Sequence, residues 1–211
     1  MNILYVYAHP NSASLNASMK QQVEATLKTN GASVIITDLY AQGFKAVADQ
    51  QDFLVDGHDA NQQYFLAQQA AYQTHHLAAD IQAELEKIAW ADHIILQFPL
   101  WWFGMPAIMK GWFDRVMVKG FAYDTGKTFA TGLLQGKTAA LTVTTQSPAS
   151  AYQPDGVHGA TIAEFLLPIH HTLRFAGIKT LDPFIAYSAF NLDAAQQEKI
   201  MRDYQCYLAG K

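Results

Sequence analysis

Short apolar segments typical of β-strands alternate along this chain with segments of helical periodicity. Strands that alternate with helices form parallel sheets, because a parallel neighbour needs a crossover connection and a helix supplies it. The sequence therefore predicts an α/β fold: a doubly wound five-stranded parallel sheet with helices on both faces. The expected strands are residues 2–8, 33–37, 93–98, 137–145 and 179–187, and the expected helices are 15–29, 80–88, 106–118, 161–175 and 194–208.

The length and spacing of these elements indicate one domain, residues 1–211. No internal repeat, low-complexity tract or linker divides the chain. The stretch 39–76 is rich in Asp, Gln and Ala, and we expect it to be irregular. It is too long for a simple connection, which predicts a functional or interface role.

Composition excludes some classes of protein. A net charge of −4 and a pI near 6.0 give no support for a nucleic-acid surface. The single cysteine, Cys206, cannot form an internal disulfide, and no leader or bilayer-length apolar run is evident, so we expect a cytoplasmic protein. Charged residues make up only 15% of the chain, which favours surface hidden in a homodimer.

The most informative local segment is QFPLWWFGMPAIMKGWFDRV, residues 97–116. A buried strand ends at Pro99, three aromatic residues follow, and a helix is expected to start with Pro106 in its first turn. Packing of a core does not require three consecutive aromatic residues between a strand and a helix. Binding of a flat aromatic ligand would explain them. In open α/β sheets, ligands bind in the crevice outside the carboxyl ends of the strands, where this loop should lie.

Two other loops follow expected strands. The first, HPNSASLN (residues 9–16), combines a histidine, hydroxyl groups and a helix N-terminus, which together favour an anion site. An equally weighted alternative is that Ser14 only caps the helix. The second loop, residues 147–160, carries Tyr152 and His158, which can donate hydrogen bonds or protons to a developing anion. Taken alone, that loop fits an ordinary surface loop better.

Several chemistries lack their motifs. No G-x-G-x-x-G loop is present, which argues against a Rossmann dinucleotide site. The pairs His75-His76 and His170-His171 stand outside any metal-binding motif, so we expect no metal. Ser147 and Ser150 lack the nucleophile elbow G-x-S-x-G, so a hydrolase triad is not expected.

The whole set of motifs resembles the flavin-dependent NAD(P)H:quinone oxidoreductases of the flavodoxin-like fold, a family that includes the mammalian quinone reductases. The resemblance covers nearly the whole chain. Its motifs are YAHPNSASLN, QYFLAQQAAYQTHHLAADI, the 97–116 segment, GFAY, TVTT and AYQPDGVHG. It implies FAD as cofactor, with FMN as an alternative, NAD(P)H as hydride donor and a quinone or similar planar acceptor.

The resemblance also implies roles for individual residues. His9, Ser14, Leu15 and Asn16 would hold the flavin diphosphate and ribityl chain. The ring would lie against Pro99, Leu100, Trp101, Trp102 and Phe103 on one side, and Thr144, Thr145, Gln146 and Ser147 on the other. Tyr152 and His158 would be catalytic at its pyrimidine edge. Gln63, from a partner subunit, and Asp114 would approach the adenosine end, and the substrate pocket would contain Trp102, Phe103, Tyr123 and Phe175.

The sequence departs from the family pattern in three ways. Gln146 and Ser147 stand where the family usually has two glycines, Thr125 replaces a pocket tyrosine, and Gln197 falls near an arginine that helps to hold adenosine. The last difference weakens the preference for FAD over FMN.

The leading hypothesis is a two-electron, ping-pong reductase in which hydride passes from NAD(P)H through flavin N5 to the acceptor. A second hypothesis is a regulatory flavoprotein subunit of a glutathione-gated potassium efflux system, which would dock on a membrane partner. A third is an azo- or nitro-compound reductase. A plain flavodoxin electron carrier fits least well, because it would be more acidic and would not need the 39–76 stretch.

Overall fold

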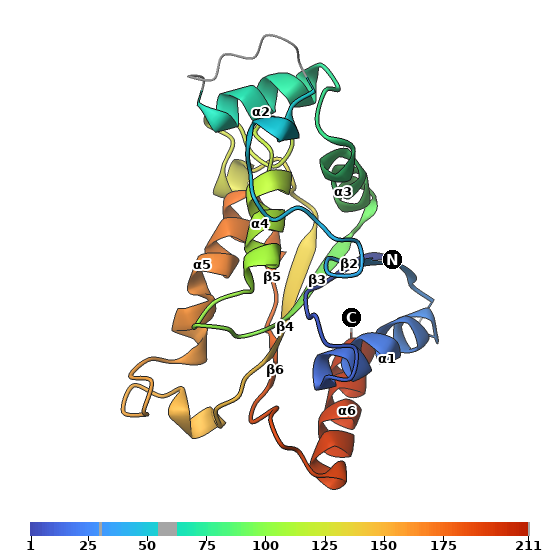
Figure 1. The fold of residues 1–211 in the computed structure, drawn as a ribbon, viewed down its shortest axis with the longest axis vertical. Coiled ribbons are helices and arrows are strands. Elements are labelled where there is room, and N and C mark those ends of the chain that lie inside the picture. Colours follow the sequence, from blue (N-terminus) through green and yellow to red (C-terminus); the bar gives the residue numbers. More distant parts are fainter. Residues whose placement is uncertain (30, 55–62, 211) are drawn as a thin grey trace.

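The computed structural model describes residues 1–29, 31–54 and 63–210. Its centre is a parallel sheet with strand order β2-β1-β3-β4-β5, and a further short strand, β6, also pairs with β4 (Figure 1). The prediction of a doubly wound parallel sheet is therefore confirmed. The strands are β1 (Asn2–Tyr7), β2 (Ser33–Asp38), β3 (His93–Pro99), β4 (Thr138–Thr144), β5 (Lys179–Thr180) and β6 (Phe184–Ala186).

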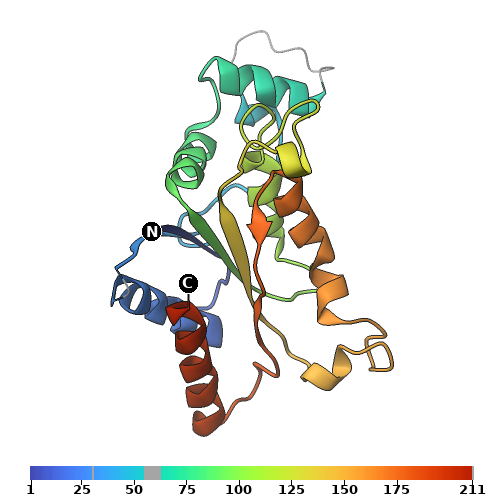
Figure 2. The same cartoon turned by 180° about the vertical axis from the view of Figure 1, so that it is seen from behind.

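Helices cover both faces of the sheet, as predicted. On one face, β1 packs through Ile3, Tyr5 and Tyr7 against α1 and α6, which lie side by side in Figure 2. The opposite face of β1, including Leu4 and Val6, packs in a larger core with the other helices. The helices are α1 (Leu15–Thr29), α2 (Tyr64–Gln73), α3 (Ala79–Trp90), α4 (Ala107–Val116), α5 (Ile162–Phe175) and α6 (Ala194–Ala209).

The strand order locates the crevice where ligands bind in such folds. β1 lies between β2 and β3, so the connections leave β1 and β3 toward opposite faces. At this switch point the loops after the two strands separate and leave a crevice at the carboxyl edge of the sheet. The loops that follow β1, β3 and β4 are the three that sequence analysis predicts as a ligand site.

Three element predictions need correction. The 39–76 stretch is not irregular throughout, because it contains a short 3₁₀ helix, η1 (Gln50–Asp52), and α2, while residues 55–62 lie outside the described part of the chain. The predicted last strand is two short strands, since Pro183 has no N–H to donate to a ladder. Pro106 is the N-cap of α4 and not its first helical residue.

Within the residues that the structure describes, no helix has both the length and the apolar character needed to cross a bilayer.

Candidate cofactor and active site

Two adjoining cavities form one cleft at the carboxyl edge of the sheet. The first has a volume of about 340 Å³ and the second about 260 Å³, and Leu100, Trp101 and Gln146 line both. The first is otherwise lined by Trp102, Phe103, Ser147, Tyr152 and His158. The second is otherwise lined by His9, Ser14, Leu15, Asn16, Pro99, Thr144, Thr145, Ala189 and Phe190. The structure thus brings most of the predicted site residues into one cleft.

The aromatic loop after β3 is a tight turn. Trp101 and Gly104 exchange both backbone hydrogen bonds at 3.0 Å, and the two residues between them have positive φ, 50° at Trp102 and 62° at Phe103. Two positive φ values in succession make the type I′ turn of two-residue hairpins, which normally selects Asn-Gly. A bulky side chain in this conformation stores about 1–3 kcal/mol of strain. Trp102 is also 96% exposed, so its own burial does not offset that strain.

The loop after β1 presents polar groups to the second cavity. The Asn11 N–H donates to Nδ1 of His9 at 3.1 Å, which leaves Nε2 as the protonated nitrogen of the neutral ring. Partial burial lowers the pKa of His9, although a backbone contact with Asn11 opposes this. His9 therefore acts as a neutral donor through Nε2.

Ser14 is both a helix cap and part of the cleft. Its hydroxyl donates to the Asn11 carbonyl at 2.7 Å and accepts from the Ala17 N–H at 3.2 Å, as an N-cap residue does. It also lines the second cavity. The two readings of this serine are therefore compatible.

Asn16 is held at the junction of α1 with the strand ends. Its Nδ2 donates to Thr144 Oγ1 at 2.8 Å, and Gln97 Nε2 donates to its backbone oxygen at 2.8 Å. Asn16 and Thr144 are buried, so the floor of the cleft is set before any ligand binds.

The loop after β4 places Tyr152 and His158 together. Their rings lie 4.8 Å apart, and Phe103 meets the His158 ring edge-on at 5.2 Å. The loop folds back tightly at Gly156, where a Cβ would come within 2.5 Å of the Ser150 carbonyl oxygen. Tyr152 is buried and His158 is half-buried, so this is not an ordinary solvated loop.

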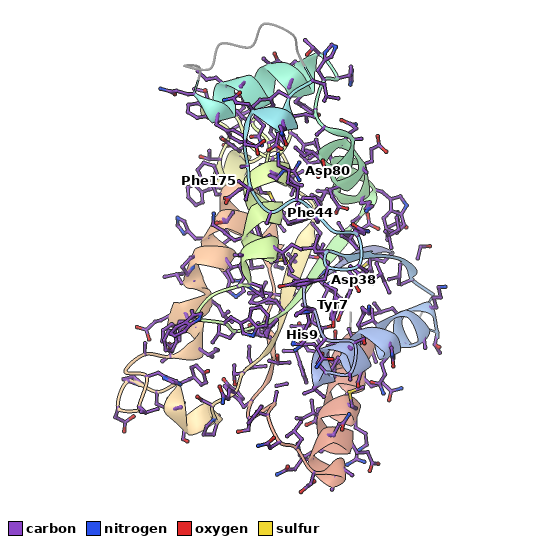
Figure 3. All side chains as sticks on the ribbon, in the orientation of Figure 1. Tyr7, His9, Asp38, Phe44, Asp80 and Phe175 are labelled. Carbon is purple, nitrogen blue, oxygen red and sulfur yellow. The ribbon has the colours of Figure 1, made fainter. Side chains whose placement is uncertain are left out.

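The other predicted site residues lie elsewhere. Tyr123 and Phe175, with rings 5.2 Å apart, line a separate cavity of about 350 Å³ together with residues of α2, α4 and α5. Asp114 lines this cavity too, and not the cleft of its own chain. Gln63 is exposed at the start of α2. In Figure 3, Phe175 and His9 are far apart along the molecule.

Sequence reasoning missed Ala189 and Phe190, which line the second cavity from the loop after β6. Phe190 is 63% exposed. No pattern in the sequence indicates this role, because the loop reaches the cleft only through the pairing of β6 with β4. In the described part of the chain, no group of histidine, cysteine or acidic side chains is arranged to hold a metal ion.

Comparison with known proteins places this geometry in a family. The family model described as flavodoxin-like fold matches residues 1–208. The chain belongs to the flavodoxin-like fold family. Human ribosyldihydronicotinamide dehydrogenase (quinone) is 42% identical to it over 190 residues, which cover 88% of this chain and 81% of the human protein.

Two further relatives agree. Rat NAD(P)H dehydrogenase (quinone) 1 is 41% identical over 187 residues, covering 88% of this chain and 68% of the rat protein. A crystal structure from Klebsiella pneumoniae, described as a candidate quinone reductase, superimposes with a TM-score of 0.93 at 38% identity, over 99% of this chain and 83% of the other.

The residues of the cleft fit a flavin. Nε2 of His9 and the N-terminus of α1 suit a phosphate, because both present N–H donors to an anion. The aromatic turn offers a flat wall, and Ser147, Tyr152 and His158 supply hydrogen-bonding groups at one end. Among the described residues, none with a carboxylate lines either cavity of the cleft.

Proposed function

We propose that this chain is a flavin-dependent NAD(P)H:quinone oxidoreductase. The observation that carries the proposal is the cleft itself, in which an anion-binding loop, a strained aromatic turn and a Tyr–His pair meet. About 40% identity to quinone reductases over most of the chain supports the same activity. A planar ligand stacked on the aromatic turn would explain the strain of its backbone.

Each part of the cleft has a task in this reaction. A bound flavin supplies the redox chemistry, accepting hydride from NAD(P)H and passing it to a quinone. His9 and Asn16 hold the phosphate and ribityl portions, and the aromatic turn orients planar partners against the ring. Tyr152 and His158 donate hydrogen bonds, or a proton, where negative charge accumulates at the pyrimidine edge.

We propose FAD over FMN as the cofactor. Phe190 lines the second cavity together with His9 and Ser14 and is 63% exposed, so it would offer an adenine ring a stacking surface. Gln197, in the first turn of α6, counts against FAD, because it is exposed and has no positive charge to offer the adenosine part. Release of the bound flavin, followed by chromatography, decides between FAD and FMN.

We also propose a homodimer that completes the site. Trp102 is 96% exposed in the single chain, and the cavity of Tyr123 and Phe175 is lined in part by α2, whose Phe65 is 41% exposed. A second copy would cover both surfaces if its Tyr123 cavity faced the aromatic turn. Gln63 and Asp114 would then approach the cofactor from the other copy.

The first experiment is a cofactor and kinetic test. The purified protein should be yellow, with one flavin per chain, and stopped-flow mixing with NADH or NADPH should bleach it rapidly. Dihydronicotinamide riboside belongs in the donor panel, because the human relative is named for that type of donor. Quinones, azo dyes and nitro compounds form the acceptor panel. A protein that takes up neither FAD nor FMN would refute the proposal.

The second experiment tests the dimer. Sedimentation at micromolar concentration should give a dimer, and Phe65→Glu should shift the protein toward monomer, because it buries a charge in the contact. The control is Val47→Glu, an exposed apolar position that lines neither the cleft nor the Tyr123 cavity. A monomeric wild-type protein with full activity would overturn this part of the proposal.

A further inference from the structure

Ser147 touches the catalytic pair directly. Its Oγ lies 3.0 Å from Nε2 of His158. The backbone of Ser147 is fixed on two sides, since its carbonyl oxygen accepts from Thr145 Oγ1 at 2.8 Å and from the Ser188 N–H at 3.2 Å. The hydroxyl is therefore presented by the end of β4 and not by a free loop.

The imidazole of His158 is confined by the groups around it. Tyr152 lies against the ring at 4.8 Å, and Phe103 meets it at 5.2 Å with an interplanar angle of 74°. The backbone N–H of His158 donates to the Ala151 carbonyl at 3.1 Å, which ties the backbone to η3 (Ala149–Ala151). With the ring so placed, the Ser147 contact decides which nitrogen is available to a ligand.

This contact bears on which nitrogen of the neutral His158 ring carries the proton. Either partner of this contact can donate. We take the serine as the donor, because Nε2 of His158 is the one acceptor within hydrogen-bond distance of its hydroxyl in the described structure. A nitrogen that accepts a hydrogen bond leaves the proton of the neutral ring on the other nitrogen. Nδ1 of His158 would then carry the N–H, and it is also the nitrogen left free to donate to a bound group.

We infer that Ser147 is a positioning residue that keeps His158 in the Nδ1–H form, and so makes it a hydrogen-bond donor toward the reduced cofactor. The donation from His158 to the reduced cofactor rests on the proposed function, whereas the tautomer of His158 does not. Ser147 touches no reacting atom in this scheme. It acts through the imidazole.

Nitrogen NMR of the cofactor-free protein tests the tautomer. The chain has eight histidines, and ¹⁵N-histidine labelling with a His158→Gln reference assigns the relevant ring. At alkaline pH, where imidazoles are neutral, wild-type His158 should show a protonated Nδ1 and an unprotonated Nε2. Ser147→Ala should move the population toward the Nε2–H form, and Ser147→Thr, which keeps a hydroxyl, should restore the wild-type pattern.

The matched control is Ser150→Ala. Ser150 is exposed in the same loop region, and no side-chain hydrogen bond involves it in the described structure, so its replacement should leave the His158 spectrum unchanged. A wild-type Nε2–H tautomer, or a tautomer unaffected by Ser147→Ala, would overturn the inference.

Single-turnover reduction of the flavin-loaded enzyme tests the consequence. Ser147→Ala should slow reduction roughly threefold, which is less than the loss expected from removing His158 itself. In a His158→Ala background the same substitution should have no further effect. An equal slowing in both backgrounds would contradict the role. If the protein bound no flavin, the proposed function would fail while the NMR result would still decide the tautomer.

Discussion

The cofactor cleft and the charged region next to α2 differ in how far their main side chains are buried and paired within the chain. A charge network joins η1, α2, α3 and α4 around a buried pair, Asp52 and Arg115. Its other members are the partly exposed Lys45, Tyr64 and Asp80. Arg115 is 1% exposed and Asp52 is fully buried. The Arg115 guanidinium donates to the carboxylates of Asp52 and Asp80. In the cleft, by contrast, Trp102 is 96% exposed on a strained backbone.

This difference separates groups that hold the fold from groups that await a ligand. In the network, each charge has its partner inside the chain, so these interactions stabilise the folded state without any ligand. In the cleft, the ring of Trp102 is open to solvent, and burial of that ring does not offset the strain of its backbone. In Figure 3, Asp80 lies apart from His9 along the molecule, and so does Phe44, whose ring lies 4.9 Å from the Arg115 guanidinium. Substitutions in the two regions should therefore move different measurements.

The largest expected effect is on stability, from Arg115→Ala. Removal of the guanidinium leaves Asp52 fully buried without its main partner, which typically costs about 3–5 kcal/mol. Urea denaturation should show this loss in the free energy of unfolding. Arg202→Ala on α6 is the control, since its pair with Glu198 is exposed and should contribute little. Equal effects of the two substitutions would remove the contrast between the regions.

The same network should make stability depend on pH. Burial alone would raise the pKa of Asp52, but hydrogen bonds from Arg115, Tyr64 and Lys45 outweigh it and hold that pKa below its ordinary value of 3.8. A carboxyl group with a lowered pKa contributes stability above its unfolded pKa and loses it as the pH falls through the folded pKa. The free energy of unfolding should thus drop as the pH falls below about 4. Asp52→Asn should flatten this drop, and parallel pH curves for the two proteins would contradict the assignment.

Much of the fold was predictable because its signals are local. Apolar periodicity located four of the five predicted strands to within one or two residues at each end, since each is bounded by turn residues. The last strand was predicted as continuous, although Asp182-Pro183 marks the interruption in the sequence. α2 was missed because its N-cap, Gln63, makes no side-chain capping bond, so the start of the helix carries no capping signal.

The cleft was predictable to the extent that its residues follow strand ends. Loops after β1, β3 and β4 must meet at one edge of a parallel sheet, and the aromatic turn is conspicuous by composition. Phe190 was not predictable, because its approach depends on β6 pairing with β4. The partners of Arg115 come from positions 45, 52 and 80, at separations that follow no helical or strand period. Only tertiary packing brings these charges together.

In the cleft, the largest effect should fall on rate and not on stability. His158→Ala should slow flavin reduction about tenfold, equivalent to about 1.4 kcal/mol of barrier, because one of several donors to the developing anion is lost. Tyr152→Phe should act in the same direction, and the double variant should be less than additive because both groups serve one charge. Flavin content should stay the same. Unchanged single-turnover rates in all three variants would make this loop structural only.

The smallest expected effect is the one that most directly separates strain from function. Trp102→Asn places a residue that tolerates positive φ at the first of the two strained positions of the turn, and the lost side chain is almost fully exposed, so little packing is given up. The flavin-free variant should be more stable than wild type by about 1 kcal/mol in urea denaturation. Its KM for planar acceptors should rise, because the stacking surface is gone. Phe103→Asn is the matched control, since that ring stacks on Phe165 at 4.9 Å and its loss should cancel the gain. If Trp102→Asn destabilised the flavin-free protein instead, the exposed tryptophan would belong with the groups that hold the fold, and the contrast between the two regions would fail at its clearest point.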